Sequence, residues 1–127
     1  TIEDAEKWVR KAQDGFLNKQ EWLFSAFLKS SGQYIGSVNL HKSGEEAETG
    51  YWLHRDFRRQ GYGGEMLRFI IDFAFDKTGV GKVFATTALD NKASQKILEK
   101  TGFVKAGETS VETPQGMRRS LRFDRIQ

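Results

Sequence analysis

One seven-residue segment constrains the fold more than any other part of this chain. Residues 58–64 read RRQGYGG and lie between a strand-like segment and a long amphipathic segment of helical period. Glycine tolerates the left-handed backbone of a tight turn, and the first N–H groups of a helix have no partner within the helix. Together with the helix dipole and the two arginines, such a turn is typical of a phosphate or pyrophosphate site. We therefore expect a strand, an anion-binding turn and a helix.

The segment ahead of the turn contains a helical pattern and three strand patterns. Apolar residues at helical spacing open the chain: Ile2, Ala5, Trp8, Val9 and Ala12. They predict a helix that begins at Thr1 or Asp4 and ends at Gly15. The predicted strands cover residues 22–29, 34–41 and 47–54. Because short turns join these strands, they should pair as an antiparallel meander.

The segment after the turn alternates between helix and strand. Apolar residues recur at three and four residues from Tyr62 to Ala74, which predicts a buried helix face. The next elements predicted are an interior strand at 83–88, a helix from Asp90 or Asn91 to 102, and strands at 103–108 and 117–123. The order predicts a single domain over residues 1–127 with a mixed α/β fold. Its sheet is mostly antiparallel with one parallel crossover and is flanked by helices.

Composition excludes several classes of protein and site. The chain has no cysteine, so it holds no disulfide or thiolate metal site, and this fits a cytoplasmic protein. No His, Asp or Glu cluster has metal-ligand spacing, and no apolar run is long enough to cross a membrane. The net charge of +3 suits an anionic ligand. Its 17 acidic residues are interspersed among 20 basic ones, so a small basic nucleic-acid binder is a weak alternative.

Two common glycine-rich nucleotide motifs do not match the turn. A P-loop ends in Gly-Lys followed by Ser or Thr, which this chain lacks. A dinucleotide-binding fold needs a third glycine after Gly61 and Gly63, and an acidic ribose ligand at the end of the next strand. That strand ends in Ala-Leu-Asp, where Asp90 is better placed as a helix cap.

The pattern that does match is R-x-x-G-x-G, made by Arg58, Gly61 and Gly63. With the block N-x-x-S at 91–94 and the sequence EKTGF at 99–103, it resembles the GNAT superfamily of N-acetyltransferases. The sequence AETGYWL at 47–53 is similar to the RimJ/RimL branch of that superfamily. The resemblance implies acetyl-CoA as cosubstrate, without a metal, and an amine acceptor such as a protein N-terminus, a polyamine or a small amine.

The resemblance also assigns residues to the cosubstrate. The pantetheine arm would meet backbone groups where the third meander strand separates from its parallel neighbour, and the diphosphate would bind N–H groups of residues 59–64. The residues so assigned are Trp52, Leu53, His54, Arg58, Arg59, Gly61, Tyr62, Gly63, Gly64 and Asn91. The alternative for Asn91 is a plain helix cap.

The catalytic assignments rest on Glu48 and Ser94. An amine is protonated at neutral pH, and family members use a glutamate to remove that proton. Glu48 is the candidate base, with Glu45 and Glu46 nearby and a solvated edge charge as the alternative. The resemblance places Ser94 near the thioester sulfur. Because Leu98 stands where many family members have a tyrosine acid, proton donation to the departing thiolate would come from Ser94, from water or from no specific group. His41 and His54 are expected to be packing or surface residues.

Domains of this branch usually begin with a strand and helix ahead of the segment that starts here, so we expect that N-terminal strand to be missing and the acceptor site to be incomplete. An acyl-CoA-binding module without turnover, serving as a sensor or docking unit, is the main alternative function. The acceptor amine and the oligomeric state stay open, a homodimer being one option.

Overall fold

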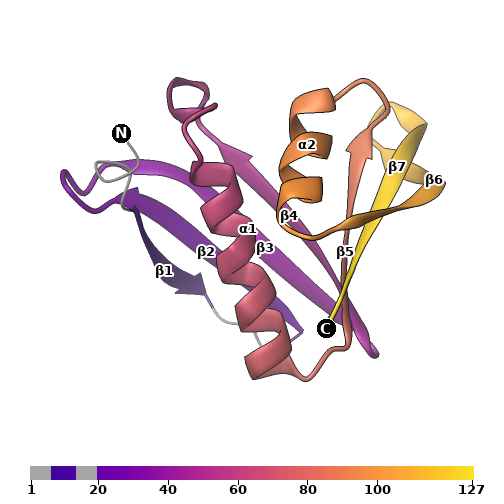
Figure 1. Ribbon diagram of the computed structural model, residues 1–127, viewed down its shortest axis with the longest axis horizontal. Helices are drawn as coiled ribbons and strands as arrows, with labels where there is room; N and C mark the ends of the chain where they lie inside the picture. The colour runs from indigo at the N-terminus through magenta and orange to yellow at the C-terminus, as the bar shows by residue number, and fades with distance from the viewer. Residues whose placement is uncertain (1–6, 14–19) are drawn as a thin grey trace.

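The computed structural model describes residues 7–13, as backbone only, and residues 20–127. The elements in chain order are β1 (Lys7–Gln13), β2 (Glu21–Leu28), β3 (Tyr34–Ser43), β4 (Glu46–Leu53), a 3-10 turn η1 (Arg55–Phe57), α1 (Tyr62–Phe73), a π turn η2 (Ala74–Thr78), β5 (Lys82–Ala88), α2 (Lys92–Lys100), β6 (Val104–Thr113) and β7 (Gly116–Ile126). Figure 1 shows α1 and α2 lying on the same side of a twisted sheet.

The sheet has seven strands in the order β1-β2-β3-β4-β5-β7-β6. The pair β4–β5 is parallel, and every other neighbouring pair is antiparallel. The parallel pair is joined through α1, as expected for a crossover connection. The predicted mixed fold, with its meander and one parallel crossover, is therefore confirmed.

The N-terminal prediction is wrong within the described residues. Residues 7–13 form a strand that pairs with β2, whereas the apolar spacing predicted a helix there. Pairing with β1 satisfies backbone groups along the outer side of β2, which an isolated helix could not do. The segment also holds Trp8 and Val9, whose types favour strands. The predicted helix limits at Thr1, Asp4 and Gly15 lie outside the described residues.

The core lies between the sheet and the two helices. The buried face of α1 consists of Tyr62, Gly63, Met66, Leu67, Ile70 and Ile71. At one end of this core, Phe24 of β2 meets Phe69 and Phe73 edge-on, with ring centroids 5.0 Å apart in each case. Such aromatic contacts add to the burial of apolar area. The core therefore fixes α1, and with it the turn that precedes α1, against the sheet.

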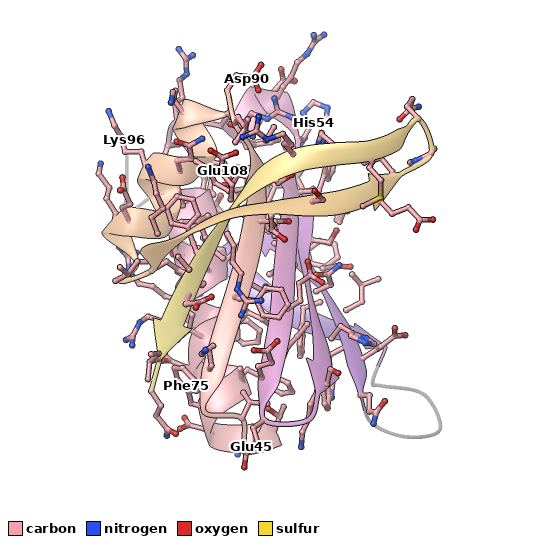
Figure 2. All side chains as sticks on the ribbon, turned by 90° about the vertical axis from the view of Figure 1, so that its right-hand side faces the viewer. Glu45, His54, Phe75, Asp90, Lys96 and Glu108 are labelled. Carbon is pink, nitrogen blue, oxygen red and sulfur yellow. The ribbon has the colours of Figure 1, made fainter. Side chains whose placement is uncertain are left out.

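The last two strands are longer than predicted and form a projecting hairpin. Thr113 pairs with Gly116 at the tip, where the hydroxyl of Thr113 donates to the Gly116 carbonyl over 2.7 Å. A register shift occurs between Lys105 and Gly107, and Gly107 has a φ of 124°. A bulge of this kind increases the local twist. Figure 2 shows the hairpin extending away from the side that carries the helices.

The face of the sheet away from α1 and α2 is called the back face below. On β4, Ala47, Thr49 and Leu53 are buried toward the helices, so residues that alternate with them point the other way. The cross-strand registers extend this alternation to β5 and β7. The back face thereby carries Glu46, Glu48 and Trp52 of β4, Phe84 and Thr86 of β5, and Arg122 and Asp124 of β7.

Candidate active site

Strands β4 and β5 pair over a short distance and then separate. Their register joins Glu46 to Lys82, Ala47 to Val83 and Glu48 to Phe84, and no later pair follows. Beyond this point β4 continues to pair with β3, and β5 continues to pair with β7. Figure 1 shows the two strands together near the C-terminus and diverging toward α2. The separation expected from the resemblance is thus present.

Asn39 of β3 binds β4 where it leaves β5. The Gly50 N–H donates to Asn39 Oδ1 over 2.8 Å, and the Thr49 hydroxyl donates to the Asn39 carbonyl over 2.7 Å. Both contacts hold β4 to β3 immediately after its last pair with β5. The position of the separation is therefore fixed by specific hydrogen bonds as well as by the ladder.

The hydrogen bonding between β3 and β4 determines which β4 backbone groups face the gap where β5 has separated, called the open side. The His54 N–H donates to the Ile35 carbonyl over 2.8 Å, so the His54 amide is used within the sheet. In an antiparallel pair the bonding direction alternates along the strand, so Trp52 also faces β3, whereas Tyr51 and Leu53 face away from it. Of Trp52, Leu53 and His54, which the resemblance assigned to the cosubstrate, only Leu53 presents its backbone groups to the side that faces away from β3. Tyr51 was missed, because its identification needs the register.

The turn between β4 and α1 is held by side-chain contacts to its own backbone. Arg58 Nε donates to the Leu53 carbonyl over 3.0 Å, and the Asp56 N–H donates to His54 Nδ1 over 3.2 Å. Two residues have left-handed backbone, Arg59 with a φ of 64° and Gly61 with a φ of 88°. The first is costly for a residue with a side chain, and the second explains why glycine is needed there. The conformation of the turn is therefore strongly specified.

The turn leaves several N–H groups without an internal partner. Gly61 is the N-cap of α1 and makes no side-chain capping bond; its carbonyl accepts from the Glu65 N–H over 3.2 Å. Within the part of the chain that is described, the N–H groups of Gly61, Gly63 and Gly64 donate to no other group. They lie at the positive end of the helix dipole. This combination fits an anionic group such as a diphosphate.

The two glycines inside the first turn of α1 have different surroundings. A Cβ on Gly63 would lie 3.4 Å from both Ile97 of α2 and the ring of Tyr51, so Gly63 allows α1 to pack closely on its neighbours. A Cβ on Gly64 would meet only the end of the Arg68 side chain, whose nearest atom, Nη1, lies at the ordinary contact distance of 3.5 Å. A large residue at 63 would disturb the core, so position 64 is the better place to test anion binding. Tyr62 is buried and packs on Phe57, while Arg59 is exposed.

The start of α2 lies shortly after the end of β5. Asn91 is the N-cap, and its side chain accepts from the Ser94 N–H over 3.2 Å, so the capping role is observed. Gln95 is buried, and its amide donates to the carbonyls of Ala88 and Leu89, both over 3.1 Å. Gln95 therefore links α2 to the end of β5. The sequence did not predict this role, because glutamine is usually a surface residue. Leu98, which stands where many family members have a tyrosine acid, is buried in the core.

The three glutamates around the start of β4 have different environments. Glu45 lies in the connection between β3 and β4 and is exposed. Glu46 binds Arg122 Nη2 over 3.2 Å. Glu48 is exposed on the back face, at the last pair with β5, and makes no ion pair with any other described residue. Of the three, Glu48 is the carboxylate closest to the separation of the strands. Figure 2 shows Glu45 at one end of the molecule and His54 and Asp90 at the other.

The histidines have local partners. His41 Nδ1 lies 3.0 Å from Glu21 Oε1, and His54 accepts from the turn as described above. Among residues 7–13 and 20–127, no group of three or more His, Cys, Asp or Glu side chains is arranged to hold a metal ion. In the same residues, no helix is long and apolar enough to cross a membrane.

Comparison with known proteins places this geometry in context. The protein named "Probable N-acetyltransferase YjcK" from Bacillus subtilis is 29% identical over 111 residues, which are 84% of this chain and 61% of that protein. The solved ribosomal-protein-S5-alanine acetyltransferase from Vibrio fischeri has a TM-score of 0.76 at 21% identity, covering 84% of this chain and 62% of that one. A spermidine N-acetyltransferase SpeG variant from Vibrio cholerae has a TM-score of 0.76 at 17% identity, covering 87% and 68%.

The matches differ in how much of each chain they cover and in what they share with it. The solved structures share the fold, and the chain spans about three fifths of the length of the first curated relative. The family model for the acetyltransferase (GNAT) domain matches residues 1–104, which include the glycine-rich turn, the separated strands and α2. The chain therefore belongs to the GNAT acetyltransferase family.

Proposed function

We propose that the chain is the domain of an acetyl-CoA-dependent N-acetyltransferase of the RimJ/RimL type, which acetylates a primary amine. The observation that carries the proposal is the separation of β4 and β5 beside a turn whose glycine N–H groups have no partner among the residues that the structure describes. A diphosphate on those N–H groups would let the pantetheine arm enter between the strands. Tyr51 and Leu53 would then offer backbone groups to it, and Arg58 would keep the turn in place through the Leu53 carbonyl.

The proposed reaction is direct attack by the amine. The amine first gives its extra proton to the Glu48 carboxylate, directly or through water, and its nitrogen then attacks the acetyl carbonyl carbon. A C–N bond forms as the C–S bond breaks, and CoA leaves as a thiolate. The proton that the new amide nitrogen still carries passes to the thiolate through Ser94 or water, so the products are the neutral amide and the CoA thiol. Backbone N–H groups of β4 would stabilise the oxyanion. Asn91 would add a pantetheine contact through the part of its amide that does not cap α2.

The acceptor in this proposal is a primary amine. A protein N-terminus, a polyamine and a small amine are the candidate classes, and two of them match acceptors named for proteins of the same fold. The proposed location is the cytoplasm, as expected from the sequence. A homodimer stays one option for the assembly.

A turnover screen tests the proposal. Acetyl-CoA would be combined with spermidine, with peptides that begin in alanine or serine, and with an aminoglycoside. Because the chain has no cysteine, release of the CoA thiol can be followed with a thiol reagent without a signal from the protein. Turnover with one acceptor supports the proposal. CoA binding without transfer to any acceptor would favour a non-catalytic acyl-CoA-binding module, and the absence of both would contradict the proposal.

A further inference from the structure

Arg122 on the back face connects three strands at the point where β4 and β5 are still paired. Its Nε lies 2.8 Å from Asp124 Oδ1, and its Nη2 lies 3.2 Å from Glu46 Oε1. The guanidinium carbon also lies 3.9 Å from the centre of the Phe84 ring. A planar guanidinium can bind carboxylates and stack on a ring at the same time. Arg122 therefore holds β7, β5 and β4 together beside the proposed base.

The register places this network next to Glu48. Phe84 pairs with Glu48 on one side and with Asp124 on the other, so the ring under Arg122 is the direct cross-strand neighbour of Glu48. Glu46 lies two residues before Glu48 on the same face, at a distance of about 7 Å along the strand. Glu46 is thus the nearest carboxylate on the same strand, and it is the one that Arg122 binds.

The remaining charged groups around Glu48 come from all the strands beside it. His41 of β3 is its cross-strand partner and is bound to Glu21 of β2. On the other side, Lys82 of β5 lies 3.8 Å from Asp124 of β7. Each of these groups has an opposite charge or a hydrogen-bond partner of its own. Among these groups on the described strands, the Glu48 carboxylate is the one without an ion pair.

We propose that Arg122 is a positioning residue for the proton-transfer step: by binding Glu46 it neutralises the carboxylate nearest to Glu48, and Glu48 is left as the single base. The proposal rests on the proposed function. Without Arg122, Glu46 would place a second negative charge beside Glu48, and like charges make ionisation of a neighbouring carboxyl harder. Arg122 would therefore select which glutamate works and set the pH range in which it works.

The charge of Arg122 is secure in any ordinary assay. Burial of the guanidinium favours its neutral form, but the hydrogen bonds and charges of Asp124 and Glu46 outweigh this, so the pKa of Arg122 lies above its ordinary value. Because this pKa is raised, the stabilisation from pairing Arg122 with Asp124 and Glu46 is fully present below the ordinary pKa of arginine. It is lost only as the pH rises through the raised pKa. Arg122 therefore keeps its positive charge across the pH range of the assay.

The test is the pH profile of kcat/KM, with spermidine or an alanine-initiated peptide as acceptor, whichever turns over faster. In Arg122→Gln we expect the acidic limb to move up by about half a pH unit, which lowers the rate on that limb about threefold. In Glu46→Gln the guanidinium loses its β4 carboxylate, and the limb should move in the opposite direction. The double variant should return close to the original profile, because both added charges are absent.

Three outcomes separate the possible explanations. If Arg122 only stabilises the packing of the strands, Arg122→Gln and Glu46→Gln should each lower kcat/KM without shifting its acidic limb. The double variant should then be no better than the single ones, and this result would overturn the inference. If Glu48→Gln turns over normally, the proposed base is wrong, and the proposed function fails at that step. If Glu48→Gln is impaired but the limb stays in place in Arg122→Gln and Glu46→Gln, only the role of Arg122 is refuted.

Two further variants serve as controls. Arg119→Gln removes an arginine on the same strand that is ion-paired to Glu108 and makes no bond to β4, so the limb should stay in place. Arg122→Lys keeps the charge but loses the planar fork, and its profile should stay near the original one. If Arg122→Gln does not fold, as judged by its melting curve, the opposite shift in Glu46→Gln decides the matter alone.

Discussion

The turn before α1 and the back face around Glu48 lie at opposite ends of β4, yet the chain builds them in different ways. The turn presents backbone N–H groups from one continuous segment, and its chemistry depends on residues that lack side chains. The back face gathers Glu46, Glu48, Phe84 and Arg122 from three strands, and its chemistry is entirely in side chains. Binding of the cosubstrate and proton transfer should therefore be separable by mutation.

The largest expected effect is at Glu48. In Glu48→Gln the base is lost, and kcat/KM should fall by about 10²–10⁴-fold, while the affinity for CoA stays within twofold of the original. Kinetics with the acceptor found in the screen measure the first quantity, and calorimetry with CoA measures the second. Equal losses in rate and in CoA affinity would break the distinction between the two regions.

The next largest effect is at the turn. In Gly64→Asp a carboxylate would face the diphosphate, and we expect at least a tenfold loss of CoA affinity, equivalent to about 1.4 kcal/mol. An acidic residue in the first turn of a helix stabilises it, so the melting temperature should not fall. At saturating acetyl-CoA, kcat should be close to that of the original protein.

Gly81→Asp is the matched control for this change. A Cβ at Gly81 would meet no atom within 4 Å, and the residue lies immediately before β5, away from the turn. The substitution adds the same charge to the same molecule. If Gly81→Asp weakens CoA binding as much as Gly64→Asp does, the effect is one of net charge, and the turn has no special part in it.

The smallest effect concerns Asn91, which has a structural role and a proposed binding role. Loss of the cap in Asn91→Ala should reduce the free energy of unfolding by about 1 kcal/mol, as measured by urea denaturation. Asn91→Asp keeps the cap and should keep the stability. If both variants bind CoA normally, Asn91 is only a cap; weaker CoA binding in Asn91→Asp would assign the amide to the cosubstrate.

The same contrast explains what could be predicted from the sequence. The anion-binding turn could be predicted because its glycines, its arginines and the helix that follows are adjacent in the chain. Gly61 has the positive φ that its position in the motif requires. The buried stripe of α1 could be predicted because Met66 and Ile70 repeat at helical spacing, and Ala74 at the start of η2 continues the repeat.

What depends on register could not be predicted in this way. The pairing of β3 with β4 decides which backbone groups face away from β3: those of Tyr51 and Leu53 do, whereas the His54 N–H is bonded to β3. The contact between Arg122 and Glu46 joins residues 76 positions apart. Residues 7–13 show the same limit, since the helical spacing of Trp8, Val9 and Ala12 was outweighed by the pairing available along β2.

The most direct test of the account compares the binding of CoA and pantetheine by isothermal titration calorimetry. Pantetheine has the arm that would enter between β4 and β5 but lacks the diphosphate. If the glycine N–H groups of the turn bind the diphosphate, CoA should bind at least tenfold more tightly than pantetheine, and Gly64→Asp should remove most of the difference. Equal affinities for the two ligands, or no heat with CoA at millimolar concentration, would contradict the account.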